Sequence, residues 1–226
     1  MISQGISHTA YDVMREYMIT GAELDGKYQI PMMERYTDRP GEDTVDFKDS
    51  FSPKIKNHRK LTVNFYIHDC EFERIWNNPD RYLEHLKCFH SVIAPDFSMA
   101  VGQDGMPFAM NIWQKYRNHA LSYYLSMNGI RVIPNVNIPP EYCYDWAFDG
   151  VPKRSTVACC TNGRIKARAS REEFCKGFKE MEKRIEPLRV IIVGTIPPEL
   201  KTDAEIVNFK THSQKIRDRE GKYNGI

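Results

Sequence analysis

The chain has 226 residues, 41% of them hydrophobic and 27% charged, a composition close to that of ordinary soluble domains, which excludes extensive disorder and fibrous repeats. Its mean hydropathy is −0.56, and its longest purely aliphatic run, residues 190–193, is far shorter than the roughly 20 residues of a membrane-spanning helix. The net charge of +2 is too small to indicate nucleic-acid binding by itself.

The chain begins without the basic and apolar segments of a secretory signal, and its six cysteines include no Cys-x-x-Cys pair. This combination favours reduced thiols rather than a disulfide framework. We therefore expect a protein of the cytoplasm.

The N-terminal region, residues 1–43, is expected to form a helix followed by a loop. Apolar residues from Tyr11 to Met18 recur at helical spacing, and Gly21 is a plausible stop. At the other end, residues 210–226 contain five basic and two acidic side chains, and we expect a frayed, solvated tail. Between these regions, residues 44–209 are expected to form the core of a single α/β domain that spans residues 1–226.

Short runs rich in β-branched and aromatic residues predict seven strands in this core, at residues 44–47, 61–67, 91–94, 130–134, 156–160, 189–193 and 205–209. Helices are expected at residues 79–89, 107–128, 141–149 and 170–185, with Asn78 and Ser170 as N-terminal caps. Strands that alternate with helices predict a mostly parallel sheet of repeated βα units. The sheet could form a complete or incomplete barrel, or it could be open and doubly wound.

In both architectures ligands bind beyond the carboxyl ends of the parallel strands. Polar residues follow these ends in the sequence, and we choose Asp96, Asp69, His68 and Asn135 as candidate catalytic residues. Two carboxylates from neighbouring strands could act as general acid and base or could hold a divalent metal. Polar residues at strand ends also commonly cap helices or form turns, which is the competing interpretation.

The loop after the strand at 156–160 supplies the candidate ligand-binding residues, which are Thr161, Asn162, Arg164, Lys166 and Arg168. Thr161 and Asn162 could hydrogen-bond a ligand, and the three basic side chains beside a helix N-terminus would suit phosphate. A solvated loop is the competing interpretation.

Sharper motifs are absent from the sequence. It contains no Walker A loop, Gly-x-Gly-x-x-Gly, Gly-x-Ser-x-Gly or His-Glu-x-x-His, which disfavours common ATPases, dinucleotide oxidoreductases, elbow hydrolases and zinc proteases. No residues have the spacing of a typical zinc site, so no metal ligands are assigned. The cofactor is left unknown, with a divalent metal as an open alternative.

Several segments in fixed order resemble a domain-of-unknown-function family, number forty-four seventeen, found in phages, prophages and other mobile elements of Firmicutes. They are residues 94–98 (APDFS), 106–107, 112–113, 116–118, 129–135 (GIRVIPN), 148–153 (FDGVPK), 161–163 and 191–194. The resemblance covers roughly residues 28–209 and implies a mobile-element origin, so the expected cytoplasm is that of a host cell. It implies no established activity and no catalytic residues.

Two functions follow as hypotheses. The first is a phage or mobile-element accessory protein that is an enzyme, or a degenerate enzyme, acting on a phosphate-bearing ligand such as a nucleotide or nucleic acid. The second is a non-catalytic protein that binds a host protein or nucleic acid, for example an anti-defence inhibitor. Neither requires a membrane.

Overall fold

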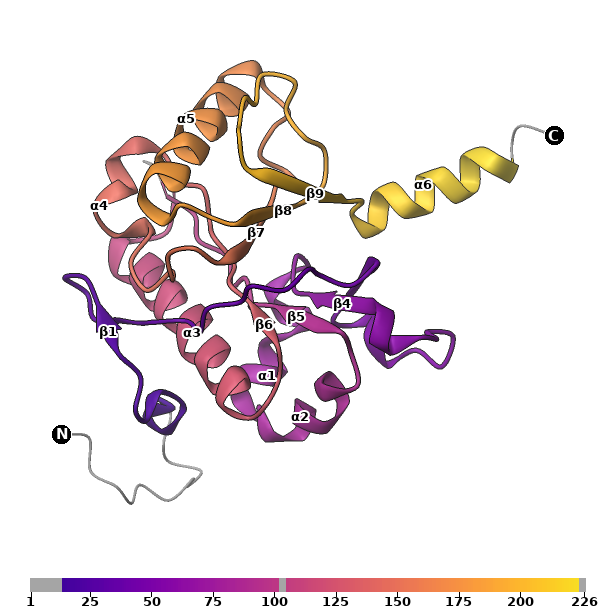
Figure 1. Ribbon diagram of the computed structural model, residues 1–226, viewed down its shortest axis with the longest axis horizontal. Coiled ribbons are helices and arrows are strands. Elements are labelled where there is room, and N and C mark those ends of the chain that lie inside the picture. The colour runs from indigo at the N-terminus through magenta and orange to yellow at the C-terminus, as the bar shows by residue number, and fades with distance from the viewer. Residues whose placement is uncertain (1–13, 102–104, 224–226) are drawn as a thin grey trace.

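The computed structural model describes residues 14–101 and 105–223, which form a single domain of mixed α/β class built on two parallel sheets (Figure 1). The first sheet contains, in hydrogen-bonded order, β3 (Asp43–Asp46), β4 (Leu61–Asn64), β5 (Ser91–Ile93) and β6 (Val132–Ile133). The second contains β7 (Thr156–Cys160), β8 (Arg189–Val193) and β9 (Glu205–Phe209). A short antiparallel hairpin, β1 (Leu24–Asp25) and β2 (Ile30–Pro31), precedes them.

Among the described residues, one isolated bridge joins the two sheets. Asn135 forms a parallel bridge with Ala158, in which Ala158 N–H donates to the Pro134 carbonyl and Val136 N–H donates to the Ala158 carbonyl, both at 2.8 Å. The seven strands therefore run parallel and in chain order from β3 to β9. No pairing of β3 with β9 occurs within residues 14–101 and 105–223, so the structure is compatible with an incomplete barrel.

Helices connect most of the strands. They are α1 (Glu73–Asn77) and α2 (Asp80–Lys87) before β5, α3 (Phe108–Met127) before β6, α4 (Tyr144–Ala147) before β7, α5 (Arg168–Ile185) before β8, and α6 (His212–Tyr223) after β9. Short 3-10 helices are found at Glu16–Ile19, Asp49–Phe51, His58–Lys60, Asp69–Glu71 and Glu141–Cys143. Figure 1 shows α3 crossing the centre of the molecule and α6 extending away from it.

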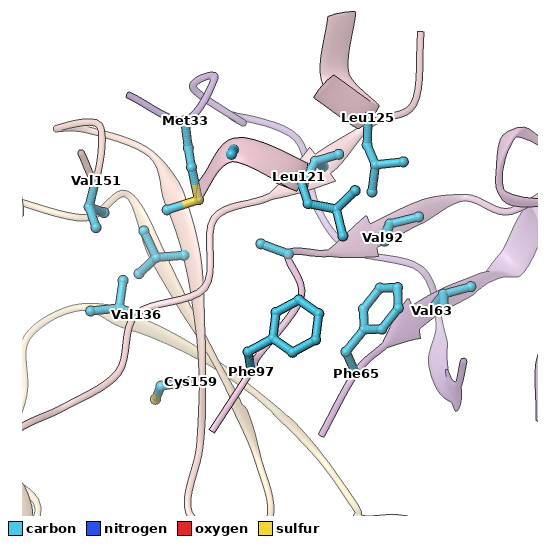
Figure 2. Packing of buried hydrophobic residues seen from close by; sticks show 14 of the residues in the cluster. Met33, Val63, Phe65, Val92, Phe97, Leu121, Leu125, Val136, Val151 and Cys159 are labelled. Atoms are coloured by element: carbon cyan, nitrogen blue, oxygen red, sulfur yellow. The ribbon is translucent and has the colours of Figure 1, made fainter. Parts of the chain in front are cut away.

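The hydrophobic core lies on both sides of the strands. The larger cluster packs the helices against the sheets and includes Phe65, Phe97 and Leu121, none of which is exposed (Figure 2). A smaller cluster contains residues of β5 to β9, among them Ile93, Ala158 and Ile191. The alternate residues of these strands thus face a second, shared interior, as in a sheet that curves upon itself.

The predicted α/β class is confirmed, and the strands at 156–160, 189–193 and 205–209 are found as predicted. Of the other strands, β3 has the predicted length but begins and ends one residue earlier, β4 and β5 end earlier than predicted, and β6 contains only Val132 and Ile133. The prediction of a helix at residues 11–18 lies partly outside the described residues, and the described part forms only a 3-10 turn. The division of the chain at residues 43 and 209 stays a prediction.

Three local predictions are wrong. Ser170 does not cap α5, because that helix already begins at Arg168. Asn78 does not cap α2; it ends α1, a helix that was not predicted. The tail is not frayed over residues 212–223, where α6 begins with reciprocal hydrogen bonds between Thr211 and Gln214, an arrangement that stabilises helix N-termini.

Helix α3 is unusual because it buries polar side chains as well as apolar ones. Asn118 donates to the Phe97 carbonyl and accepts from Phe97 N–H. Lys115 donates to the Ala147 carbonyl at 2.9 Å and lies 3.1 Å from His119 Nε2, while His119 Nδ1 donates to the Pro31 carbonyl at 3.0 Å. Because these groups satisfy one another, α3 holds the hairpin, α4 and the segment after β5 in fixed positions.

Gly150 allows the closest of these contacts and provides a stability test. Its φ is +72°, and an added Cβ would lie 2.7 Å from both His119 Nδ1 and the Pro31 carbonyl oxygen. Gly129 has a similar φ of +82° but no atom within 4 Å of an added Cβ. Gly129→Ala should therefore cost only the left-handed strain of about 1–2 kcal/mol, whereas Gly150→Ala should cost at least about 1–3 kcal/mol more. Urea unfolding of both variants measures the difference, and equal losses would contradict the close approach.

Lys115 provides a pH test. Burial lowers the pKa of Lys115 to about 7, against the opposing influence of Asp149 and Asp25. The unfolded chain keeps this proton up to about pH 10, so the native state binds fewer protons above pH 7 and stability rises with pH, by at most about 1.4 kcal/mol per pH unit. Lys115→Met should remove this rise between pH 7 and 10, as measured by urea unfolding. The exposed Lys176→Met should retain it; parallel curves for the two variants would refute the low pKa.

Candidate functional site

The carboxyl ends of the strands surround a cavity of about 700 Å³, a volume within the range of small-molecule sites. Its lining comes from the ends of β3 to β8 and from the start of α6, and it includes Asp46, Tyr66, Asp96, Asn135, Arg164 and His212. Parallel strands place their carboxyl ends at one edge, so polar residues far apart in the sequence meet there.

Asp96 is the most firmly held carboxylate of the cavity. Asn135 Nδ2 donates to Asp96 Oδ1 at 2.8 Å, and Asn137 Nδ2 donates to the same oxygen at 2.9 Å. Burial raises the pKa of Asp96, while these two amides and the Arg164 guanidinium oppose the rise. A raised pKa brings a carboxyl group closer to the range in which it can exchange a proton during catalysis.

Asn135 also orients Tyr66. The Tyr66 hydroxyl donates to Asn135 Oδ1 at 2.8 Å, so the two polar atoms of this amide are both engaged. Burial raises the pKa of Tyr66 well above its ordinary value, and the Asp96 charge adds to the rise. The phenol therefore stays protonated and serves as a fixed donor.

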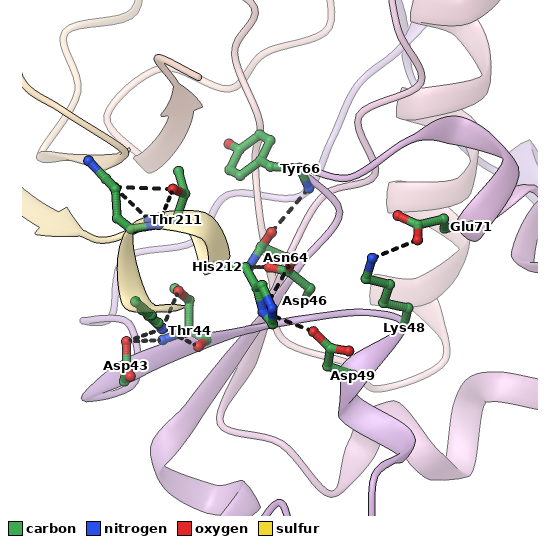
Figure 3. A network of polar contacts seen from close by, with 12 residues as sticks. Asp43, Thr44, Asp46, Lys48, Asp49, Asn64, Tyr66, Glu71, Thr211 and His212 are labelled. Atoms are coloured by element: carbon green, nitrogen blue, oxygen red, sulfur yellow. Dashed lines mark hydrogen bonds and ion pairs between the residues drawn. The ribbon is translucent and has the colours of Figure 1, made fainter. Parts of the chain in front are cut away.

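A hydrogen-bonded chain connects this group to β3. Tyr66 N–H donates to Asn64 Oδ1 at 3.1 Å, and Asn64 Nδ2 donates to Asp46 Oδ1 at 3.0 Å (Figure 3). Burial raises the pKa of Asp46, and the hydrogen bond from Asn64 opposes this rise. Asp46 and Asp96, which lie on different strands, thus line one cavity and share one polar network.

Asp46 also belongs to a cluster that sequence analysis missed. His212 Nδ1 lies 3.1 Å from Asp49 Oδ2 and 4.0 Å from Asp46 Oδ2 (Figure 3). Within the described ranges, these three residues are the group whose donor atoms could hold a metal ion. The signal available in the sequence was Asp46 at the end of a predicted strand; His212 lay in the segment expected to fray, and nothing paired it with Asp49.

Five of the nine predicted site residues line the cavity: His68, Asp96, Asn135, Asn162 and Arg164. Asp69 does not line it, because its carboxylate accepts hydrogen bonds from Ser98 N–H and from the Ser98 hydroxyl, the latter at 2.8 Å. Asp69 therefore anchors the segment after β5 from outside the cavity lining, although its charge is near enough to add to the raised pKa of Asp96.

Three predicted ligand-binding residues also lie outside the cavity lining. Thr161 is buried beside Gly194, where its hydroxyl has no hydrogen-bond partner among the described residues. Lys166 is exposed. Arg168 belongs to α5 and forms an ion pair with Glu172 at 2.8 Å, so the predicted basic loop contributes one cation, Arg164, to the lining.

The charges of the lining are mixed. Lys48 forms an ion pair with Glu71 at 2.6 Å, whereas no salt bridge to a carboxylate is found for Arg164 in the described part of the chain. The Arg164 side chain donates a hydrogen bond to the Ile138 carbonyl, which holds it over the segment after β6. With Asp46, Asp96 and Glu173 also present, this cavity is not a purely basic phosphate pocket.

The neighbouring cysteines offer no nucleophile. Cys159 is buried in the core, and burial raises the pKa of Cys160 to about 12. A thiol with so high a pKa is protonated at neutral pH and weakly reactive. All six cysteines are free, as predicted.

A search of the described helices finds none that is long and apolar enough to cross a membrane.

Comparisons with known proteins give two related phage proteins. The chain is 31% identical over 134 residues to the Gene 1 protein of Mycobacterium phage L5, covering 59% of this chain and 57% of that protein. It is 28% identical over 134 residues to the Gene 1 protein of Mycobacterium phage D29, covering 59% and 48%. The chain thus spans about half the length of the curated relatives it matches, and their hosts are mycobacteria, which belong to the Actinobacteria and not to the Firmicutes.

No solved structure matches the chain. The family described as "Domain of unknown function (DUF4417)" matches residues 22–210, which include the strands β1 to β9 and the residues that hold Asp96. The protein therefore belongs to the DUF4417 family, as the resemblance in its sequence motifs predicted.

Proposed function

We propose that this protein is a phage or mobile-element accessory protein that binds a phosphate-bearing ligand of nucleotide size in the cavity at the carboxyl ends of its strands, and acts on it as an enzyme. The phage origin rests on the similarity to the two Gene 1 proteins. A Firmicutes host and a cytoplasmic location stay predictions.

The observation that carries the proposal is the pairing of Asp96 with Arg164 in one cavity. Asp96 is held by two amides, and its pKa is raised by burial. Arg164 lines the same cavity and is near enough for its charge to oppose that rise. Arg164 supplies the donors that phosphate recognition uses, and Asp96 supplies a general base or acid.

The volume of the cavity selects among phosphate-bearing ligands. About 700 Å³ suits a nucleotide, or a single nucleotide at the end of a strand, rather than a duplex. Tyr66 forms part of its wall and offers an aromatic surface of the kind on which proteins stack bases.

The competing proposal, a non-catalytic protein that binds a host protein or a long nucleic acid, is supported by a different feature. Helix α6 extends from the body (Figure 1) and contacts it through its first residues, where Lys215 pairs with Asp43 at 2.7 Å. Such a projecting element could engage a macromolecule, including a component of host defence.

Arg164→Gln tests the proposed ligand site. Titration calorimetry with ATP, and with a short single-stranded DNA in a second series, should show binding to the native protein that weakens at least about tenfold in Arg164→Gln, the range expected for loss of a charge-assisted contact. Lys166→Gln is the matched control, because it removes the same charge from the same loop outside the cavity, and it should bind as the native protein does. Equal weakening by both variants would contradict the site.

Asp96→Asn tests catalysis separately from binding. Incubation of each ligand with the native protein, followed by mass spectrometry, should reveal a product, and Asp96→Asn should bind the ligand but form at least about a hundredfold less product, as loss of an acid/base group predicts. Bound ligand recovered unchanged from the native protein would favour the non-catalytic alternative.

A further inference from the structure

The cluster of Asp46, Asp49 and His212 joins two distant parts of the chain at the rim of the cavity. Asp46 ends β3, Asp49 begins the 3-10 helix that follows it, and His212 is the first residue of α6. The hydrogen bonds between Thr211 and Gln214 fix the start of α6. Each of the three side chains is thus carried by an ordered backbone (Figure 3).

The spacing of the donor atoms suits a shared cation. At metal distances of about 2.0–2.1 Å, neighbouring ligand atoms lie about 3.0–3.3 Å apart and opposite ones about 4 Å apart. His212 Nδ1 lies 3.1 Å from Asp49 Oδ2 and 4.0 Å from Asp46 Oδ2, and the set of donor atoms fits within 4.8 Å. A small shift of side chains would therefore bring all three onto one ion.

A second observation shows that the ion pair alone leaves the cluster incomplete. Asp49 Oδ2 is buried and accepts no hydrogen bond from the described residues, although the His212 ring is 3.1 Å away. The Asp49 side chain as a whole is 35% exposed and pairs with His212, but this oxygen is shielded from solvent without an aligned donor, and a buried acceptor without a donor is unfavourable. A cation between the imidazole and the carboxylates would provide the missing partner.

Residues next to the cluster orient its carboxylates and leave them without a lysine partner. Asn64 donates to Asp46 Oδ1, which leaves Asp46 Oδ2 as the oxygen that faces His212. Hydrogen bonds to ligand carboxylates commonly orient them in this way. The nearby basic residues are already paired, Lys48 with Glu71 and Lys215 with Asp43, so neither neutralises Asp46 by a salt bridge.

We propose that Asp46, Asp49 and His212 bind one first-row divalent transition cation, such as Mn²⁺ or Zn²⁺, with open coordination positions toward the cavity. One imidazole and two carboxylates form a mixed donor set typical of these ions. Three protein ligands leave room for water or a ligand atom, and Asp46 and His212 line the same cavity as Asp96. The cation would add a second positive charge to the cavity, in which Arg164 is the proposed phosphate-binding cation.

Binding of the metal alone provides the test, without any nucleotide, so its outcome is independent of the proposed function. Metal-free protein titrated with Mn²⁺ should bind one equivalent and should enhance water-proton relaxation, because open positions hold exchanging water. Asp46→Asn, Asp49→Asn and His212→Ala should each weaken this binding at least about tenfold. Circular dichroism before titration verifies that each variant is folded.

Asp145→Asn is the matched control. Asp145 is an exposed carboxylate of α4 outside the cluster, and its replacement removes the same charge without releasing Lys215. This variant should bind Mn²⁺ as the native protein does. The proposal is overturned if the native protein binds no Mn²⁺ or Zn²⁺ stoichiometrically, or if folded Asp46→Asn and His212→Ala bind as tightly as Asp145→Asn.

Discussion

Asn135 is the residue on which the rest of the structure depends. Its backbone forms the bridge that joins the two parallel sheets, and its side chain donates to Asp96 and accepts from Tyr66. The bridge aligns the seven strands, and the alignment brings their carboxyl ends to one edge. The same residue therefore creates the cavity and fixes the carboxylate within it.

Charge explains why this cavity needs more than its own side chains to hold a phosphate. Among the basic residues of the lining, Lys48 is neutralised by Glu71, whereas Asp46 and Asp96 both face the cavity. Two carboxylates in a partly buried site repel an anionic ligand unless a cation lies between them. A metal at Asp46, Asp49 and His212 would meet this requirement, and the polar chain through Asn64, Tyr66 and Asn135 would connect it with Asp96.

Sequence reasoning located part of this arrangement for a clear physical reason. Runs of β-branched residues show in the sequence where the strands end, and parallel strands bring those ends to one edge of the sheet. Asp96 and Asn135 could therefore be placed at this edge without a structure. Asp69 was placed at this edge by the same argument, but its carboxylate accepts a hydrogen bond from Ser98 and so anchors the segment after β5. Arg168 was predicted to bind phosphate from the loop after β7, but it belongs to α5, where it pairs with Glu172 one turn away.

The remaining features depend on tertiary contacts that no local pattern announces. Asp49 and His212 are 163 positions apart in the sequence and meet only because the first residue of α6 lies beside the segment that follows β3. Helix α6 is mostly polar, with Ile216 as its one aliphatic residue, so hydrophobic periodicity does not predict it. Tyr66 was read as part of a strand, yet the chain leaves the sheet at Asn64 and directs the phenol to Asn135.

A crystal structure of the protein grown with a nucleoside triphosphate and Mn²⁺ tests the central claim most directly, that the carboxyl edge organised by Asn135 is the functional site. The account predicts phosphate density beside Arg164, within the cavity that Asp96 lines. Ligand density elsewhere on the surface, with an unliganded cavity, would contradict it.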